Sequence, residues 1–141
     1  MPTRKAKAVW EGALKGGTGR FEGEKGLTGR YNFTSRFENG EGSNPEELLA
    51  AAHAACFSMA LAAGLEKNGT PSSKVETQAE CTIEKVGEGF KITTMKLDVK
   101  VKAPGVDNAK LQELAQKTKE GCPVSGAIKG NVNIVMEARL E

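Results

Sequence analysis

The most regular pattern in the chain is an alternation of apolar and polar side chains over residues 74–86. One face carries small or apolar side chains and the other carries charged or amide side chains, which is the period of two typical of a half-buried β-strand. A glycine-containing turn at residues 87–89 leads into a second such run over residues 90–102. The alternation changes parity within this second run, which predicts a β-bulge near Thr93 and Thr94. The two runs are therefore predicted to form an antiparallel hairpin.

A stretch of 18 residues without a charged side chain covers residues 48–65 and consists mostly of alanine. Asn44 and Pro45 are typical of an N-cap and a first helical position, and Glu47 stands where a capping box has its acidic residue. Gly69 is suited to ending the helix. The length reaches that of a membrane span, but a histidine, a serine and a glycine without aromatic or basic flanks argue against insertion. A helix that is apolar on every side is otherwise expected to be buried on every side.

Shorter elements complete the predicted order. Strands are expected over residues 5–11, 18–22 and 30–34, and the last strand over residues 131–140. A second helix begins after an aspartate N-cap and stops at a glycine. The residues that define this helix are its cap Asp107, its inner face Ala109, Leu111, Leu114, Ala115 and Thr118, and its end Gly121.

This order of strands and helices, with hairpins and no regular strand–helix alternation, predicts the α+β class with a largely antiparallel sheet wrapping a buried central helix. One small sheet does not cover a helix that is apolar all round. We therefore expect a homodimer in which a second copy packs its own alanine-rich helix alongside. The length of 141 residues is that of a single domain spanning residues 1–141.

Composition narrows the choice of partners. The chain carries 20 basic and 18 acidic residues, a net charge of +2, so neither nucleic acid nor a membrane surface is an expected partner. The first ten residues are basic but lack the apolar stretch and the cleavage site of a secretory signal. The expected location is the cytoplasm.

The chemistry depends on three cysteines and a single histidine. No Cys-x-x-Cys pair or structural-zinc spacing occurs, and an odd number of cysteines argues against a disulfide framework. Cys81 lies on the inward face of its strand, where a thiol is usually a small core residue. Cys122 precedes Pro123 and is placed to cap a short helix, a position that lowers a thiol pKa. His53 lies three residues before Cys56, and packing or a dimer contact is its favoured interpretation.

Four segments together form a recognisable combination. Residues 43–59 read SNPEELLAAAHAACFSM, residues 121–125 read GCPVS, and WEG and SRFE occur at residues 10–12 and 35–38. The combination resembles the OsmC/Ohr family, and its OsmC branch most, over essentially the whole chain. The resemblance implies an OsmC-like fold in an intertwined homodimer. It also implies a thiol peroxidase that reduces organic hydroperoxides, and hydrogen peroxide less well, in defence against oxidative and osmotic stress.

The resemblance also implies roles for individual residues. Cys56 corresponds to the peroxidatic cysteine and Cys122 to the resolving cysteine, while Arg36 and Glu46 correspond to the charged pair beside the reactive sulfur. A Cys56–Cys122 disulfide would form in each cycle. An external dithiol, such as dithiothreitol or a lipoyl group on a partner protein, would reduce it, and no bound metal or cofactor is implied.

The residue types suit this chemistry. A thiolate at Cys56 attacks a peroxide oxygen and becomes a sulfenic acid. Burial alone would raise the pKa of Cys56, whereas the guanidinium of Arg36 favours the charged form, and Glu46 would hold that guanidinium in place. Glu46 and Cys56 are separated by about 15 Å along one helix. We therefore expect Arg36 and Glu46 of one subunit to serve Cys56 and Cys122 of the other.

Two other functions remain open at this point. A protein of the same fold could bind a lipid-like ligand in its apolar dimer cavity or act as a redox sensor, although retention of Cys56, Cys122 and Arg36 favours catalysis. A cysteine-dependent acyl-transfer enzyme is the third possibility, and it would need a group to orient His53. Phe37 and Phe57 are candidate lining residues for a substrate pocket.

Overall fold

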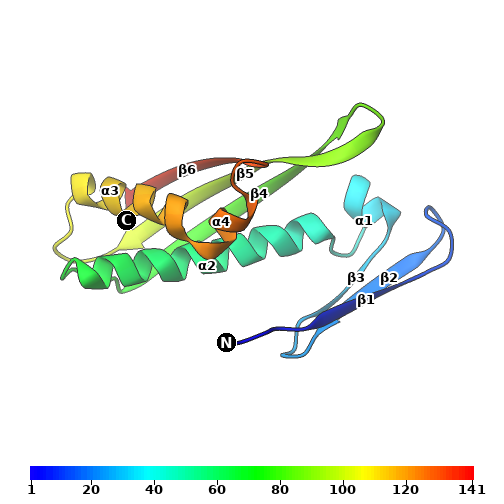
Figure 1. Ribbon diagram of the computed structural model, residues 1–141, viewed down its shortest axis with the longest axis horizontal. Helices are drawn as coiled ribbons and strands as arrows, with labels where there is room; N and C mark the ends of the chain where they lie inside the picture. The colour runs from blue at the N-terminus through cyan, green and yellow to red at the C-terminus, as the bar shows by residue number, and fades with distance from the viewer. The chain divides into compact units, whose positions relative to one another are not determined.

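The computed structural model describes all of residues 1–141, which divide into two compact units, residues 1–48 and residues 49–141 (Figure 1). Both units combine strands with helices, so the predicted α+β class is confirmed. Each unit is described by itself, and the expected single domain over residues 1–141 stays a prediction.

The first unit contains a three-stranded antiparallel sheet. Its strands are β1 (Ala6–Glu11), β2 (Thr18–Gly23) and β3 (Thr28–Tyr31), in that spatial order. The third strand was expected over residues 30–34, but it ends at Tyr31 and helix α1 (Phe33–Phe37) follows. The reason is a capping box at Asn32: its side chain accepts a hydrogen bond from the Ser35 N–H, and the Ser35 hydroxyl accepts one from the Asn32 N–H.

Aromatic rings lie over glycines in this sheet. A Cβ atom added to Gly19 would collide with the rings of Tyr31 and Trp10, and one added to Gly29 would collide with the ring of Phe21. The glycines therefore let the rings approach the backbone of the neighbouring strand closely. No apolar side chain of residues 1–48 is fully buried, so this packing takes the place of a core in the first unit.

The second unit is built on the sheet β4 (Lys74–Val86), β5 (Gly89–Lys102) and β6 (Asn133–Leu140). β4 and β5 form the predicted antiparallel hairpin, and Thr82 pairs with Thr94 while Ile83 pairs with Ile92. Thr93 is therefore an extra residue, and the predicted bulge is confirmed. β6 runs parallel to β5, so this sheet is only partly antiparallel, and β6 begins two residues later than the expected residue 131.

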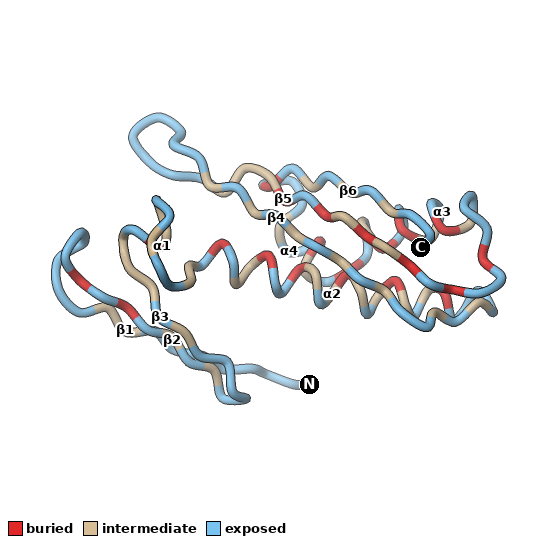
Figure 2. Tube along the Cα trace, turned by 180° about the vertical axis from the view of Figure 1, so that it is seen from behind, coloured by how far each residue is buried: buried red, intermediate tan, exposed pale blue.

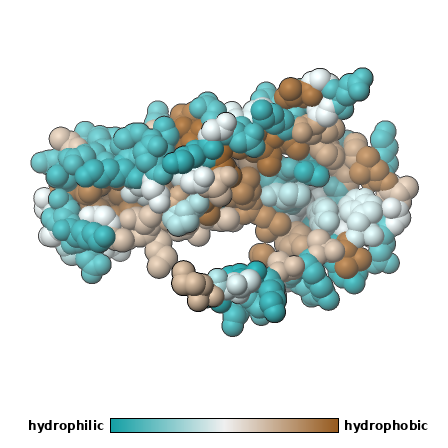
Figure 3. All heavy atoms as spheres, viewed as in Figure 1, coloured by the Kyte–Doolittle hydropathy of each residue, from teal (hydrophilic) through white to brown (hydrophobic).

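Helix α2 (Pro45–Lys67) begins as predicted, because the side chain of Asn44 accepts a hydrogen bond from the Glu47 N–H at 2.8 Å. Every fourth residue of its later turns is fully buried, as the regularly spaced red segments in Figure 2 illustrate. One chain does not cover the helix on every side, since Met59 is 79% exposed and the helix keeps an open apolar face (Figure 3), and burial of this face by a second copy stays a prediction. The buried stripe consists of His53, Phe57, Leu61 and Leu65.

By length and composition α2 is apolar enough to cross a membrane, and 22% of its apolar window is buried within the chain. Helices that a soluble protein packs into its core can have the same length and apolar composition. Three residues of the buried stripe, Phe57, Leu61 and Leu65, belong to a core cluster with β5, which is the packing of a core helix. The β5 members of this cluster are Met95, Leu97, Val99 and Val101.

Helices α3 (Asn108–Gly121) and α4 (Pro123–Ile128) complete the second unit. Asp107 caps α3 as predicted, by accepting a hydrogen bond from the Lys110 N–H at 2.8 Å. Leu111, Ala115 and Thr118 are buried, whereas Ala109, expected on the inner face, is exposed because it lies in the first turn. The short helix predicted after Cys122 is present as α4.

Candidate active site

Two sulfur atoms from distant parts of the second unit meet. The Sγ atoms of Cys56, in the middle of α2, and Cys122, between α3 and α4, lie 3.1 Å apart although the residues are 66 positions apart in sequence. No disulfide bond joins the two cysteines. Cys122 is buried, with 1% of its surface exposed, while Cys56 is partly exposed. The pair is thus within reach of a disulfide, with one sulfur more accessible than the other.

The local sequence explains how Cys122 is held. A residue before proline is kept out of the helical region, and Cys122 accordingly adopts φ −62° and ψ 132°, which ends α3 and starts α4. As the N-cap of α4, its Sγ accepts a hydrogen bond from the Ser125 N–H at 3.4 Å. This is the N-cap position predicted from the Cys122–Pro123 dipeptide.

The surroundings of the two sulfurs shift their pKa values in opposite directions. Burial raises the pKa of Cys56, and its contact with Cys122 adds to the effect, against a smaller opposing influence of the Val124 N–H. Burial also acts to raise the pKa of Cys122, but the hydrogen bonds from the side chain and N–H of Ser125, from Cys56 and from the Val124 N–H together outweigh it, and the pKa is lowered overall. Within one chain, Cys122 is therefore the sulfur of the pair that loses its proton more readily.

His53 and Ser125 lie next to this pair. His53 is fully buried, and its Nε2 atom lies 2.7 Å from the hydroxyl oxygen of Ser125, while its Nδ1 atom has no hydrogen-bond partner. Burial lowers the pKa of His53, so the ring is neutral. The sequence favours packing or a dimer contact for His53, and Ser125 is not among the predicted site residues. The signal was present, since Ser125 stands three residues after Cys122 and His53 three before Cys56.

The charged pair Arg36–Glu46 belongs to the first unit. The guanidinium Nη2 and Nε atoms donate to Glu46 Oε1 at 2.9 and 3.1 Å. Glu46 is buried, and the side chain of Arg36 is 36% exposed. The amide of Asn44 donates to the Ser35 carbonyl at 2.9 Å, which ties the start of α2 to α1. The guanidinium is therefore fixed in direction while part of it stays open to solvent.

The four residues predicted for the site thus form two pairs. Cys56 and Cys122 meet in the second unit, and Arg36 and Glu46 meet in the first. The third cysteine, Cys81, packs against the core from β4, where it is paired with Met95 across the strands. That placement fits the structural interpretation of Cys81.

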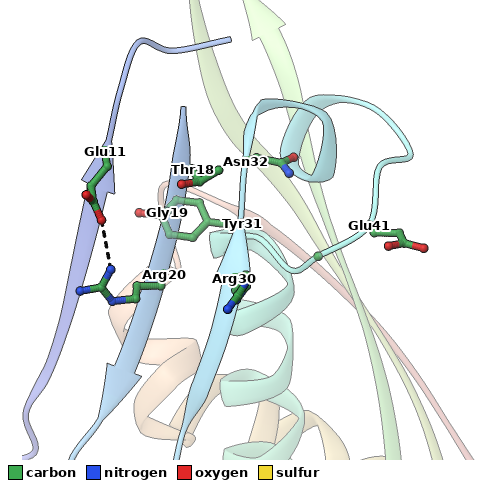
Figure 4. A pocket seen from close by; sticks show the side chains of 9 residues that line it. Glu11, Thr18, Gly19, Arg20, Arg30, Tyr31, Asn32 and Glu41 are labelled. Carbon is green, nitrogen blue, oxygen red and sulfur yellow. Dashed lines mark hydrogen bonds and ion pairs between the residues drawn. The ribbon is translucent and has the colours of Figure 1, made fainter. Parts of the chain in front are cut away.

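Each unit contains a cavity, and the one in the second unit reaches Cys122. A groove of about 470 Å³ between α2 and α3 is lined by Cys122, by apolar side chains that include Ala60 and Leu114, and by Lys67 and Lys117. A cavity of about 590 Å³ in the first unit is lined by two arginines and two glutamates, with no cysteine (Figure 4). Its opposite charges balance: Arg20 donates to Glu11 at 3.2 Å. No group of three or more His, Cys, Asp or Glu side chains is arranged to hold a metal ion.

Comparison with known proteins places these features in context. The family profile described as "OsmC-like protein" matches residues 38–137. The chain is 42% identical over 133 residues to peroxiredoxin OsmC of Escherichia coli, covering 93% of each chain. It is 37% identical over 103 residues to the organic hydroperoxide resistance protein OhrB of Bacillus subtilis, covering 72% of this chain and 74% of that protein.

Solved structures show the same fold. An organic hydroperoxide resistance protein from Elizabethkingia anophelis superimposes with a TM-score of 0.81 at 26% identity, covering 100% of this chain and 98% of that one. An organic hydroperoxide resistance protein OsmC from Legionella pneumophila gives a TM-score of 0.78 at 28% identity, covering 98% and 97%. The expected fold is thereby confirmed.

Proposed function

Because the chain belongs to the OsmC-like protein family, we propose that it is a thiol peroxidase that reduces organic hydroperoxides, and hydrogen peroxide less well, to alcohols or water. The observation that carries the proposal is the 3.1 Å contact between the Sγ atoms of Cys56 and Cys122. Its relatives named peroxiredoxin OsmC and organic hydroperoxide resistance protein support the same class of substrate. The activity serves defence against oxidative and osmotic stress.

In the first step, Cys56 is the nucleophile because it is the more accessible of the two sulfurs. Its thiolate attacks one oxygen of the hydroperoxide, the S–O bond forms as the O–O bond breaks, and the alkoxide leaves and takes up a proton to become the alcohol. The sulfur is oxidised to a sulfenic acid and the peroxide is reduced.

In the second step, Cys122 resolves the sulfenic acid. Its thiolate attacks the Cys56 sulfur, the S–S bond forms, the S–O bond breaks, and the departing hydroxide takes up a proton to become water. The short distance between the sulfurs makes this reaction fast compared with a second oxidation of Cys56. An external dithiol, of which a lipoyl group is the proposed natural form, then reduces the Cys56–Cys122 disulfide.

The first step needs a positive charge near Cys56, because burial raises the pKa of that thiol. We propose that Arg36 of a second subunit supplies it, held in direction by Glu46 of that same subunit. The polar partners of Cys56 and Cys122 are all in the second unit, and Arg36 and Glu46 bind each other in the first. A homodimer would then contain two composite sites, and the open apolar face of α2 around Met59 is the proposed contact surface.

A cysteine-dependent acyl-transfer enzyme is disfavoured by the geometry of His53. Such an enzyme needs a histidine that bonds the nucleophile and is oriented by a third group. The Nε2 atom of His53 instead bonds Ser125, and no group binds Nδ1.

The test is hydroperoxide consumption by the purified protein with cumene hydroperoxide and either dithiothreitol or dihydrolipoamide. Replacement of the nucleophile, Cys56→Ser, is expected to lower turnover by about 10³-fold or more. The matched control is Cys81→Ser, which should retain activity because Cys81 packs against the core from β4 and is not part of the sulfur pair. An inactive wild-type protein with every dithiol would refute the peroxidase and favour a ligand-binding or redox-sensing role.

A further inference from the structure

A continuous row of side chains leads from the interior of the second unit to the reactive sulfurs. His53 Nε2 lies 2.7 Å from Ser125 Oγ, the Ser125 N–H donates to Cys122 Sγ at 3.4 Å, and Cys122 Sγ lies 3.1 Å from Cys56 Sγ. His53, Ser125 and Cys122 are all buried. The two-step reaction described above uses only the sulfurs and leaves His53 and Ser125 without a role.

The unpartnered Nδ1 atom of His53 indicates the direction of the hydrogen bonds. A neutral histidine carries one ring proton, and the other ring nitrogen is an acceptor. If the proton were on Nδ1, a buried N–H donor would be left without a partner, which is rare in folded proteins. With the proton on Nε2, His53 donates to Ser125 Oγ, and only an acceptor lone pair at Nδ1 is left unused.

This direction determines what Ser125 does. A hydroxyl has one proton to donate, and a serine that accepts from His53 is free to donate its own proton elsewhere. The adjacent acceptor is Cys122 Sγ. Both the hydroxyl and the N–H of Ser125 act to lower the pKa of Cys122. The Ser125 N–H donates to this sulfur at 3.4 Å. No charged side chain of the chain forms a hydrogen bond or ion pair with His53, Ser125 or Cys122.

We propose that Ser125 is a catalytic residue of the resolving step, whose hydroxyl stabilises the Cys122 thiolate, and that His53 is a positioning residue that fixes the direction of that hydroxyl. The inference rests on the proposed peroxidase function and adds a separate device for the second half-reaction. The two sulfurs would then be activated differently: Cys56 by a guanidinium of the other subunit, and Cys122 by neutral donors of its own chain.

The reaction balances without a further reactant. Before resolution, the Ser125 hydroxyl donates to the Cys122 thiolate. As Cys122 attacks the Cys56 sulfenic acid, the S–S bond forms, the Cys122 sulfur is oxidised, the sulfenic sulfur is reduced, and hydroxide leaves to be protonated by solvent. The Ser125 proton stays on its oxygen throughout, because serine stabilises the charge and does not accept it.

The experiment separates the two half-reactions by stopped flow, using reduced protein and one equivalent of cumene hydroperoxide. Sulfenic acid is trapped with a dimedone-type reagent at set times, and disulfide is quantified by mass spectrometry of acid-quenched samples. Ser125→Ala is expected to slow disulfide formation by about 10- to 100-fold, the usual loss on removing one donor to a charged group, with sulfenic acid formation unchanged. Ser125→Thr, which keeps the hydroxyl, is expected to restore the second phase.

A spectroscopic readout tests the thiolate directly. In a Cys56→Ser background, the ultraviolet absorbance of the Cys122 thiolate should appear at higher pH after Ser125→Ala than with Ser125 intact. A purely structural role for Ser125 would not produce this shift together with an unchanged first phase. Disulfide formation at the wild-type rate in a folded Ser125→Ala protein would overturn the proposal.

If Ser125→Ala does not fold, two variants of His53 test the same proposal. His53→Gln keeps an N–H donor at similar reach and should resolve the sulfenic acid nearly as fast as wild type, whereas His53→Leu should slow that phase alone. Equal second-phase rates in His53→Leu and wild type would overturn the role of His53. Absence of sulfenic acid in the wild type would instead refute the peroxidase function, so the two failures are distinguishable.

Discussion

The two units of the chain hold their reactive side chains by different means. In residues 49–141 the sulfur pair sits beside a core of fully buried apolar side chains, which include Phe57, Leu61, Leu97 and Leu111. In residues 1–48 no apolar side chain is fully buried, and the largest buried polar group is the carboxylate of Glu46 with its guanidinium partner. The first unit therefore contains the Arg36–Glu46 ion pair but no apolar core. The second unit contains the core and the sulfur pair, but no charged side chain bonded to the sulfurs.

This difference is the reason that we propose a second subunit. Burial of apolar surface contributes about 25 cal/mol per Å², and a unit without buried apolar side chains gains little from it. Surface covered by a partner would supply that gain. The same contact would bring a guanidinium to a thiol whose pKa burial raises.

The largest effect is expected on cutting the chain between the units. A peptide of residues 1–48 should remain unfolded in isolation, since chains of this size rarely fold without a core, a metal or a partner. Circular dichroism and the dispersion of backbone amide resonances would measure this. A cooperatively melting peptide would contradict the contrast between the units.

Removal of the Arg36 guanidinium is expected to have the next largest effect. Arg36→Ala should lower the rate of Cys56 sulfenic acid formation at pH 7 by about 10²-fold, the usual loss on removing one fixed donor from a reacting oxygen or sulfur. Without the guanidinium, burial keeps the pKa of Cys56 raised and the reactive thiolate is scarce at neutral pH.

The rate of sulfenic acid formation in Arg36→Ala is expected to depend on pH in a definite direction. In Arg36→Ala, the rate should rise about tenfold per pH unit through the neutral range and approach the wild-type rate in alkali, where the thiolate forms unaided. Lys5→Ala, which removes a positive charge elsewhere in the first unit, is the matched control and should leave the profile unchanged. A constant rate deficit at all pH values would place Arg36 outside thiolate activation.

A smaller effect is expected on the free energy of unfolding when one packed side chain is truncated in each unit. Leu61→Ala removes a fully buried side chain and should lower the free energy of unfolding by about 3 kcal/mol. Val9→Ala, at a half-buried position of β1, should cost about 1 kcal/mol or less. Urea denaturation followed by circular dichroism measures both. Equal losses would show that both units depend on packing to the same extent.

The features predicted from the sequence are those specified by neighbouring residues. The N-caps at Asn44 and Asp107, the bulge at Thr93 and the helix start after Cys122 each depend on a few adjacent positions. Steric and hydrogen-bonding preferences of these residues act locally. These features can therefore be predicted without knowledge of the fold.

The features missed depend on contacts between distant segments. The parallel pairing of β6 with β5 is set by the path of the chain over α3 and α4, and the alternation within β6 does not encode its direction. The bond between His53 and Ser125 joins residues 72 positions apart. The third predicted strand gave way to α1 because the capping interaction of Asn32 with Ser35 was stronger than the β preference of Phe33.

For the site, the motifs specified residue types and the structure supplied the pairings. Cys56 and Cys122 meet, and Arg36 and Glu46 bind each other, as the resemblance to the family led us to expect. That both pairs act in one catalytic site stays a prediction. It is also the claim on which the proposed mechanism depends most.

Complementation between two inactive variants tests that claim most directly. Arg36→Ala and Cys56→Ser chains, carrying different affinity tags, are co-expressed, and the mixed dimer is isolated by two successive purifications. If Arg36 of one subunit serves Cys56 of the other, one of the two sites in the mixed dimer is intact, and its turnover with cumene hydroperoxide should be about half that of wild type. A mixed dimer as inactive as either parent would contradict the composite site and place all four residues of each site in one chain.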